Sequence, residues 1–223
     1  SDEFTVVAWD APGCGASDDP PSTFSAADYA DCVHGFIEAL GLSKAHVLGL
    51  SWGSMLALGF YERHPAATAS LVLASAYAGW AGSLPPEEVE RRVRQVLREV
   101  ELPAEAFIPD WIPTLLTPSA AQELVAEVAA LMADFHPAGM RQVALCMGQM
   151  DYRGVLPTIA VPTLLLYGDA DVRSPASTVG KDLHDRIPGS TLVAIPGAPH
   201  LANVETPDAF NAAVRGFLHE VEN

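Results

Sequence analysis

Residues 49–53 read Gly-Leu-Ser-Trp-Gly and place one hydroxyl group, that of Ser51, between two small neighbours. An apolar run, 45–48, leads into this pentapeptide, and a helix-compatible run, 54–61, follows it. A strand, a sharp turn and a helix in this order expose the central serine at the tip of the turn, and the glycines leave room for the adjoining strand and helix. The pattern therefore predicts a nucleophilic serine at Ser51.

A serine hydroxyl is a weak nucleophile until a base takes its proton and an acid orients that base. In sheets of parallel strands, such partners lie on loops at the carboxyl ends of the strands. Asp171 follows an apolar run that ends at Tyr167, and His200 follows one that ends at Ile195. The chain order serine, acid, histidine is the order expected for this kind of turn. We therefore predict a catalytic triad of Ser51, Asp171 and His200.

Other titratable residues compete for these roles. Asp169 shares a loop with Asp171, and one of the two can shape the turn through a bond from its side chain to the backbone. We favour Asp171 as the acid, and we assign Asp10, which also follows an apolar run, to a turn. The remaining histidines lie in helical patterns, at a helix end or at the start of a strand: His34, His46, His64, His136, His184 and His219.

Composition restricts the class of protein. With 223 residues, 49% apolar and 18% charged, the chain suits one large globular domain or a core with an insertion. A net charge of −16 argues against nucleic acid and anionic membranes, which bind basic surfaces. The three cysteines are too few and scattered for a disulfide framework or metal cluster, so we expect a reducing, cytoplasmic location. We see neither an apolar run of membrane-spanning length nor a secretory leader.

Short apolar strands alternate with helical patterns along most of the chain. The predicted strands are 4–9, 47–50, 70–74, 161–167 and 191–195. This alternation predicts the α/β class, with a doubly wound, mainly parallel sheet covered on both faces. Between residues 80 and 153 the alternation gives way to helical patterns broken by prolines. We therefore predict a core formed by 1–79 and 154–223, with an inserted helical cap, 80–153.

Local signals place the helix ends. Ser25 and Asp28 form the pattern of a capping box, and the helix that follows is expected to stop at Gly41. Thr206 is placed as the N-cap of the last helix. The other predicted helices are 52–63, 87–100, 119–133, 138–150, 176–186 and, at the end, 207–221.

Four motifs follow one another along nearly the whole chain: Asp10-x-Pro12-Gly13-x-Gly15-x-Ser17, Gly49-x-Ser51-x-Gly53, Val161-Pro162-Thr163 leading to Gly168-x-x-Asp171, and the loop ending in His200. In this order they resemble the α/β-hydrolase family. The resemblance implies that Ser51 is the nucleophile, Asp171 the orienting acid and His200 the general base. It also implies that the backbone N–H of Trp52 is one donor of an oxyanion hole, and that neither a metal nor an organic cofactor is needed.

The same resemblance exposes one departure. Members of the family begin with further strands, followed by a loop that supplies the second oxyanion donor, whereas this sequence opens at the strand before the Asp10 loop. We therefore expect an N-terminal segment to be missing: cleaved, present as a separate fragment, or left out of this sequence.

The identity of the nucleophile limits the reactions that this site can be expected to catalyse. Serine disfavours the dehalogenase and epoxide-hydrolase branches, which resemble this fold but use an aspartate at the turn. Residues 49–58 and 13–17 look like those of prolyl iminopeptidases, although Leu50 and Pro12 stand where those peptidases have Gly and Arg. Such peptidases need cap acids to hold the substrate amine, and the acids of 80–153 are typical of a solvated helix face. Enol-lactone and small-ester hydrolases share the Asp-x-Pro-Gly loop and the cap size.

We therefore expect a small-molecule ester or lactone as the substrate of a carboxylesterase-like enzyme. A prolyl iminopeptidase-like aminopeptidase is the alternative, and a non-catalytic receptor for small ligands is the alternative from another class. The oligomeric state stays open. Large apolar side chains of the cap are candidates for an acyl or leaving-group pocket, although helical packing explains the spacing of the two methionines equally well. These candidates are Trp80, Trp111, Phe135, Met140 and Met147.

Overall fold

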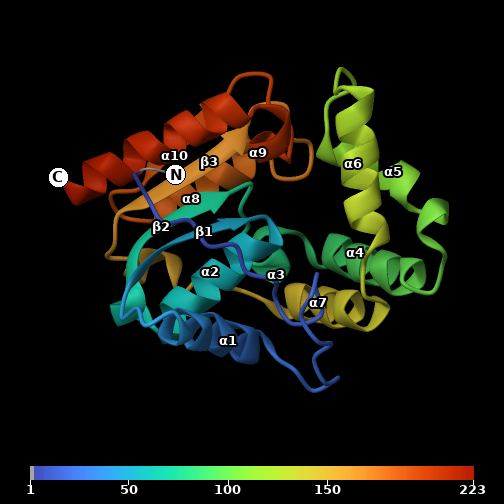
Figure 1. Cartoon of the computed structure of the whole chain (residues 1–223), viewed down its shortest axis with the longest axis horizontal. Coiled ribbons are helices and arrows are strands. Elements are labelled where there is room, and N and C mark those ends of the chain that lie inside the picture. The colour runs from blue at the N-terminus through green and yellow to red at the C-terminus, as the bar shows by residue number, and fades with distance from the viewer. Residues whose placement is uncertain (1–2) are drawn as a thin grey trace.

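The computed structural model describes residues 3–223, which contain one sheet of four parallel strands in the order β1–β2–β3–β4 (Figure 1). The strands are β1 (Ala45–Leu50), β2 (Thr68–Ala74), β3 (Thr163–Gly168) and β4 (Thr191–Ile195). The helices are α1 (Ala26–Ala39), α2 (Trp52–Arg63), α3 (Trp80–Ser83), α4 (Pro86–Glu99), α5 (Ile108–Leu115), α6 (Gln122–Ala133), α7 (Pro137–Gln149), α8 (Lys181–Arg186), α9 (Ala202–Glu205) and α10 (Pro207–Glu222).

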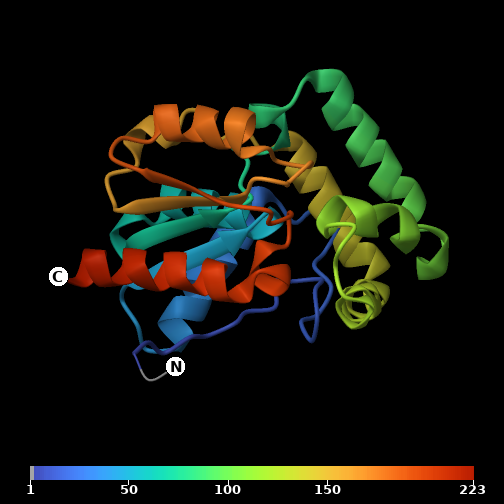
Figure 2. The same cartoon turned by 90° about the horizontal axis from the view of Figure 1, so that it is seen from above.

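The strands alternate their side chains between two helical layers, as their apolar sequences require. On one face, Leu71, Leu73 and Leu165 pack in a cluster with residues of α2 and α8. On the other face, Val72 and Leu164 pack with residues of α10. Figure 2 shows the sheet lying between α8 and α10. The predicted α/β class and the parallel sheet covered on both faces are thus confirmed.

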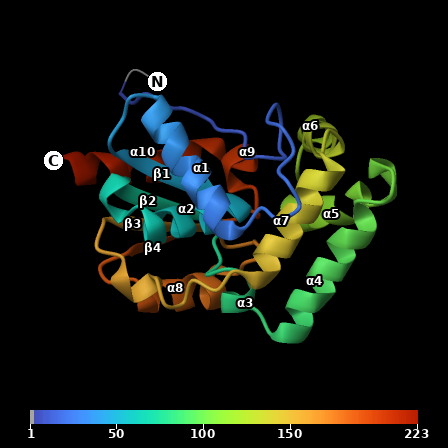
Figure 3. The ribbon, with the colours of Figure 1, turned by 90° about the horizontal axis from the view of Figure 1, so that it is seen from below.

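Parallel pairing brings the carboxyl ends of all the strands to one edge of the sheet. Leu50 of β1 is paired with Ala74 of β2, which is paired with Leu166 of β3. In Figures 1 and 3, helices α4 to α7 stand beyond that edge. The residues that follow β1, β3 and β4 therefore lie between the sheet and these helices. This region contains the predicted cap, 80–153, and the division of the chain into core and cap stays a prediction.

The predicted first strand, 4–9, is wrong. This segment forms no strand, and Val6 and Val7 are 78% and 48% exposed. A segment becomes a strand only when a neighbour pairs with its backbone groups. Within residues 3–223, the only strand that pairs with β1 is β2, and segment 4–9 does not pair with the other edge of β1. The residues of 4–9 favour the extended backbone of a strand, but this local preference does not provide a neighbouring strand to pair with.

Most of the predicted helix ends are confirmed. Ser25 and Asp28 form both bonds of the capping box at the start of α1, and α2 has the predicted bounds. The predicted helix 176–186 is instead a single π-helical turn, Ala176–Gly180, followed by α8. Thr206 precedes α10, but its hydroxyl donates to the carbonyl of Ala202 at 2.9 Å and so does not cap that helix. None of the helices in residues 3–223 has both the length and the hydrophobicity that a bilayer crossing requires.

Candidate active site

Ser51 occupies a strained turn between β1 and α2. Its φ of 53° lies in the left-handed region, where a residue with a side chain costs about 1–3 kcal/mol, so the surrounding structure must hold it there. Its backbone N–H donates to Ala74 at 2.8 Å, which ties the turn to the end of β2. Gly49 is required on the strand side because a Cβ atom there would lie 2.1 Å from the carbonyl oxygen of Gly53. Gly49 thus allows the close approach of strand and helix that the sequence predicted. The same prediction is wrong for Gly53, because a Cβ atom there would have no neighbour within 4 Å.

Asp171 and His200 form a buried pair on the loops after β3 and β4. Nδ1 of His200 lies 2.8 Å from Oδ2 of Asp171, and the two side chains are 2% and 0% exposed. The same carboxylate accepts bonds from the Ser174 hydroxyl at 2.7 Å and from the backbone N–H groups of Arg173 and Ser174 at 2.8 and 3.1 Å. Burial alone would raise the pKa of Asp171, but the bonds from His200 and Ser174 outweigh it and lower that pKa to about 2. Asp171 is therefore held as a carboxylate.

Ser75 connects the serine turn to the histidine loop. The hydroxyl of Ser75 donates to the backbone carbonyl of His200 at 2.9 Å, and the preceding residue, Ala74, receives the Ser51 N–H. Ser75 also has a left-handed φ, of 45°, and is buried. Within residues 3–223, no hydrogen bond joins the hydroxyl of Ser51 to the ring of His200. Ala74, the last residue of β2, and Ser75, the next residue, thus connect the loops that follow β1 and β4, the two outer strands of the sheet.

The competing acids have other partners. Asp169 is exposed and accepts the backbone N–H of Gly197 at 2.6 Å, and Asp10 accepts the N–H of Ala16 at 3.0 Å. Both therefore shape turns. Of the competing histidines, His46 bonds to Ser70 at 2.8 Å at the amino end of the strands, far from the loops that carry Ser51 and Asp171.

The others also have local partners. His64 lies 2.7 Å from a carboxylate oxygen of Asp31 and stacks on His34 at a ring distance of 4.0 Å. His136 lies 2.9 Å from Asp19.

Ser51 and Trp52 line a cavity of about 340 Å³ between the sheet edge and the helices beyond it. Its walls consist mainly of apolar side chains. All five pocket candidates from the sequence lie on these walls, namely Trp80, Trp111, Phe135, Met140 and Met147. Residues far apart in the sequence therefore meet around the hydroxyl of Ser51.

Four polar or charged residues of the cavity were missed by the sequence reasoning: Tyr77, Glu99, Asp134 and Arg173. Of the competing histidines, His136 also lines this cavity. Glu99 accepts bonds from the indole of Trp111 at 2.9 Å and from the side chain of Gln95 at 2.8 Å. Only Arg173 carried a usable signal, because it stands two residues after Asp171 on a loop at the carboxyl end of a strand. Tyr77 and Glu99 lie outside any motif.

Trp52 offers one backbone donor beside the nucleophile. It is the first residue of α2, so its N–H has no acceptor within the helix and is available to a developing anion. Its indole Nε1 is buried, and among residues 3–223 it is the one buried side-chain nitrogen or oxygen without a hydrogen-bond partner. The ring itself is held edge-on against Tyr29, at a distance of 5.3 Å between ring centres.

Comparisons with known proteins agree with this fold. A family model described as alpha/beta hydrolase fold matches residues 1–207. A proline iminopeptidase from Lactobacillus acidophilus is 26% identical over 97% of this chain and 81% of its own length. A 2-(acetamidomethylene)succinate hydrolase from Mesorhizobium japonicum is 27% identical, over 98% of this chain and 80% of its own. Among solved structures, a thermophilic esterase from Thermogutta terrifontis with malate bound has a TM-score of 0.88 at 28% identity, over 96% of this chain and 79% of that one.

Proposed function

The chain belongs to the α/β-hydrolase family, and we propose that it is a serine hydrolase that cleaves small carboxylic esters or lactones through an acyl-enzyme. One observation carries the proposal. Ser51 is held in a strained turn on the wall of an apolar cavity, and Ala74 and Ser75, at the end of β2, connect it to the loop of the buried Asp171–His200 pair.

The proposed proton path follows from the hydrogen bond between His200 and Asp171. With Nδ1 of His200 donating to the carboxylate, Nε2 is left without a proton and is free to take the one on the Ser51 hydroxyl. The serine oxygen then attacks the substrate carbonyl, and the protonated His200 returns its proton to the leaving alkoxide. A water molecule activated by the same histidine hydrolyses the acyl-enzyme and regenerates Ser51.

The anion that forms on the substrate oxygen needs hydrogen-bond donors. We assign one to the backbone N–H of Trp52, at the free end of α2. Removing one such donor typically lowers kcat by about 10²–10³-fold, so each donor is a large part of the acceleration. The expectation that the second donor comes from a segment preceding residue 1 stays a prediction.

The cavity supports an ester or lactone with an apolar part. Trp80, Trp111 and Phe135 present flat apolar surfaces near Ser51, which suit an acyl or alkyl chain. The likeness to an esterase of TM-score 0.88 is consistent with this substrate class.

A second candidate is an aminopeptidase of the proline iminopeptidase type. Its support is the 26% identity to such an enzyme and the carboxylate of Glu99 in the cavity, a group able to bind a substrate ammonium. The two activities share the acyl-enzyme chemistry, so they differ only in what the cavity walls recognise.

The decisive experiment asks whether Ser51 is the nucleophile. A fluorophosphonate probe should label the protein once, at Ser51, and the Ser51→Ala variant should lose both the label and at least about 10³-fold of the hydrolysis of p-nitrophenyl acetate. The Ser22→Ala variant is the matched control, because Ser22 is an exposed turn residue that does not line the cavity of Ser51. Labelling that persists in the Ser51→Ala variant would contradict the proposal.

The same preparation separates the candidate activities. Turnover of p-nitrophenyl esters without turnover of proline-β-naphthylamide supports the esterase, and the opposite result supports the aminopeptidase. A folded protein that neither reacts with the probe nor cleaves either substrate would instead favour the receptor alternative.

A further inference from the structure

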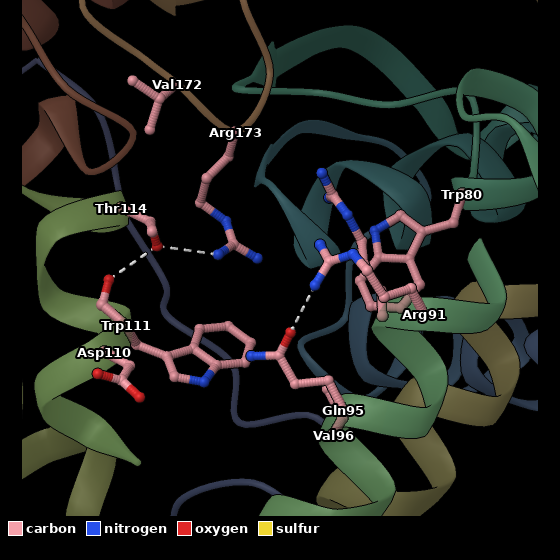
Figure 4. A pocket seen from close by; sticks show the side chains of 10 residues that line it. Trp80, Arg91, Gln95, Val96, Asp110, Trp111, Thr114, Val172 and Arg173 are labelled. Carbon is pink, nitrogen blue, oxygen red and sulfur yellow. Dashed lines mark hydrogen bonds between the residues drawn. The ribbon is translucent and has the colours of Figure 1, made fainter. Parts of the chain in front are cut away.

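A second cavity, of about 250 Å³, adjoins the one that contains Ser51 and is unusually rich in arginine. Arg91, Arg92 and Arg173 line it, against a single carboxylate, that of Asp110 (Figure 4). The whole chain has only 12 basic residues and 28 acidic ones, so a quarter of its cations line one cavity of a strongly acidic protein. This concentration of positive charge indicates an anionic ligand.

The three arginines differ in how they are neutralised. Arg91 and Arg92 both pair with Glu88 of α4, each at 2.7 Å. Arg173 has no such partner, because within residues 3–223 no ion pair joins its guanidinium to a carboxylate. Its one side-chain bond goes to the hydroxyl of Thr114 at 3.0 Å.

Burial is the main cause that lowers the pKa of Arg173, and the nearby charge of Arg92 lowers it further. The charges of Asp171 and Glu99 raise this pKa but do not offset the burial. A buried cation that forms no direct ion pair with a carboxylate is costly, and a bound anion would reduce that cost.

The backbone of Arg173 is fixed on both sides. Its N–H donates to Asp171 at 2.8 Å, and its carbonyl accepts the hydroxyl of Tyr77. The guanidinium lies over the ring of Trp111, with its carbon 4.7 Å from the ring centre. A guanidinium has five N–H donors, and only one bond is made here, so most of its edge is available. A stacked guanidinium with a free edge is pre-organised for the two parallel bonds that a carboxylate accepts.

Arg173 also connects the two cavities. It lines both of them, together with Trp80, Val96 and Trp111. In Figure 4 its side chain extends from the loop after β3 toward α4 and α5, between Thr114 and Gln95. A ligand whose reactive carbonyl lies at Ser51 can therefore extend along the apolar wall and place its far end at this guanidinium.

We propose that the substrate carries a free carboxylate at the end remote from the scissile bond, and that Arg173 binds it. The substrate class is thus the half-ester of a dicarboxylic acid, or a lactone with a carboxylate side chain. This inference rests on the proposed serine-hydrolase function and names its substrate class. It also disfavours substrates that place an ammonium at the same point, since Arg173 and Arg92 would repel it.

The first test compares matched substrates with the unaltered protein. Monoethyl adipate and monoethyl suberate carry the terminal carboxylate, and their ω-amide counterparts are uncharged esters of nearly the same shape. We expect kcat/KM, followed by ethanol release, to favour the carboxylate of at least one chain length by about 100-fold, because the amide leaves the buried guanidinium without an anion. Equal kcat/KM for acid and amide at both lengths would overturn the proposal.

The second test changes the guanidinium. In the Arg173→Met variant the preference for acid over amide should fall at least about tenfold, with Arg173→Lys keeping part of it because the charge remains. The matched control is Arg186→Met, since Arg186 of α8 is exposed, pairs with Asp182 and lines neither cavity. An unchanged preference in a folded Arg173→Met variant would overturn the proposal. If that variant does not fold, the comparison of acid and amide by the unaltered protein decides alone.

A binding measurement separates this inference from the proposed function. Calorimetry with the Ser51→Ala variant should detect binding of adipate or suberate, and the Ser51→Ala, Arg173→Met double variant should lose it. Binding that depends on Arg173, in a protein without ester turnover or probe labelling, would support the carboxylate site and refute the hydrolase. Turnover of neutral esters without any dicarboxylate binding would do the reverse.

Discussion

Two regions enclose the cavity at Ser51, and different interactions hold them in place. The strand-end loops are fixed by buried hydrogen bonds: Asp171 accepts bonds from His200 and Ser174, and Ser75 donates to the carbonyl of His200. The helices opposite are fixed mainly by apolar contacts. Half-buried polar contacts add to these, such as the ion pairs of Glu88 and the bonds from Trp111 and Gln95 to Glu99.

This difference separates chemistry from selectivity. A buried hydrogen bond left without a partner costs about 1–3 kcal/mol, so the loops tolerate few changes. An exposed ion pair contributes only about 0–1 kcal/mol, so helices α4 to α6 can change their surface residues without loss of the fold. We call helices α4 to α7 and the segments that connect them the wall. We therefore expect substitutions in the loops to abolish turnover, and substitutions in the wall to change which substrate is turned over.

The strongest test of this comparison is Asp171→Asn. The amide keeps the size of the side chain but cannot hold His200 in the tautomer that leaves Nε2 free, so we expect kcat to fall by about 10⁴-fold. Steady-state kinetics with p-nitrophenyl acetate measures the loss. Asp169→Asn is the matched control on the same loop, because its amide oxygen can still accept the Gly197 N–H, and we expect near-normal turnover. A large loss in the Asp169 variant alone would reverse the assignment of the acid.

The wall is tested by Phe135→Ala. Phe135 is half-buried, lines the cavity and packs edge-on against Phe107 at a ring distance of 5.4 Å. Removing it takes contact area from an acyl chain rather than from the reacting atoms. We expect kcat/KM for p-nitrophenyl hexanoate to fall by about 10- to 100-fold, with a much smaller change for the acetate. Phe36→Ala controls for the loss of a half-buried aromatic ring, since Phe36 of α1 contacts Trp9 away from both cavities. Equal losses for both esters would place Phe135 in the chemistry and weaken the contrast.

The sequence located the loops and the apolar residues of the wall, but it missed the polar residues of the wall, for a physical reason. The position of Ser51 depends on a local pattern of glycines, and Asp171 and His200 follow strands that periodicity can locate. Arg173 lies on a loop, but its side chain contacts Thr114 and Trp111 of the wall, which are distant in the sequence. No spacing in the sequence reports such a contact.

The same limit explains the other misses. The left-handed backbone of Ser75 depends on the loops it joins, and Ser75 is not a residue type that usually adopts that conformation. Segment 4–9 has the residues of a strand, yet a strand also needs a neighbour, which local preference cannot supply. A contact between distant segments was therefore predictable where each partner follows a strand, as Asp171 and His200 do, and was not predictable where it depends on packing alone.

The smallest expected effect lies at the outer side of the wall, at Glu88→Gln. Hydrogen bonds from Arg91 and Arg92 lower the pKa of Glu88 to about 2. Because the folded-state pKa lies below the unfolded one, this carboxylate stabilises the fold above about pH 4.3 and loses that contribution as pH falls toward 2.

The side chain of Glu88 is 28% exposed, so solvent screening limits the contribution to about 1 kcal/mol, or roughly 2–4 °C in Tm for a chain of this size. We expect Glu88→Gln to lower Tm at pH 7 by that amount and the difference to shrink as the pH is lowered below 5, in thermal unfolding followed by circular dichroism. Glu90→Gln is the control, because its pair with Arg94 is more than 60% exposed on both sides and should contribute less. A Glu88 effect of several kcal/mol that persists at low pH would show that the wall, too, depends on buried polar bonds, and the contrast between the two regions would fail.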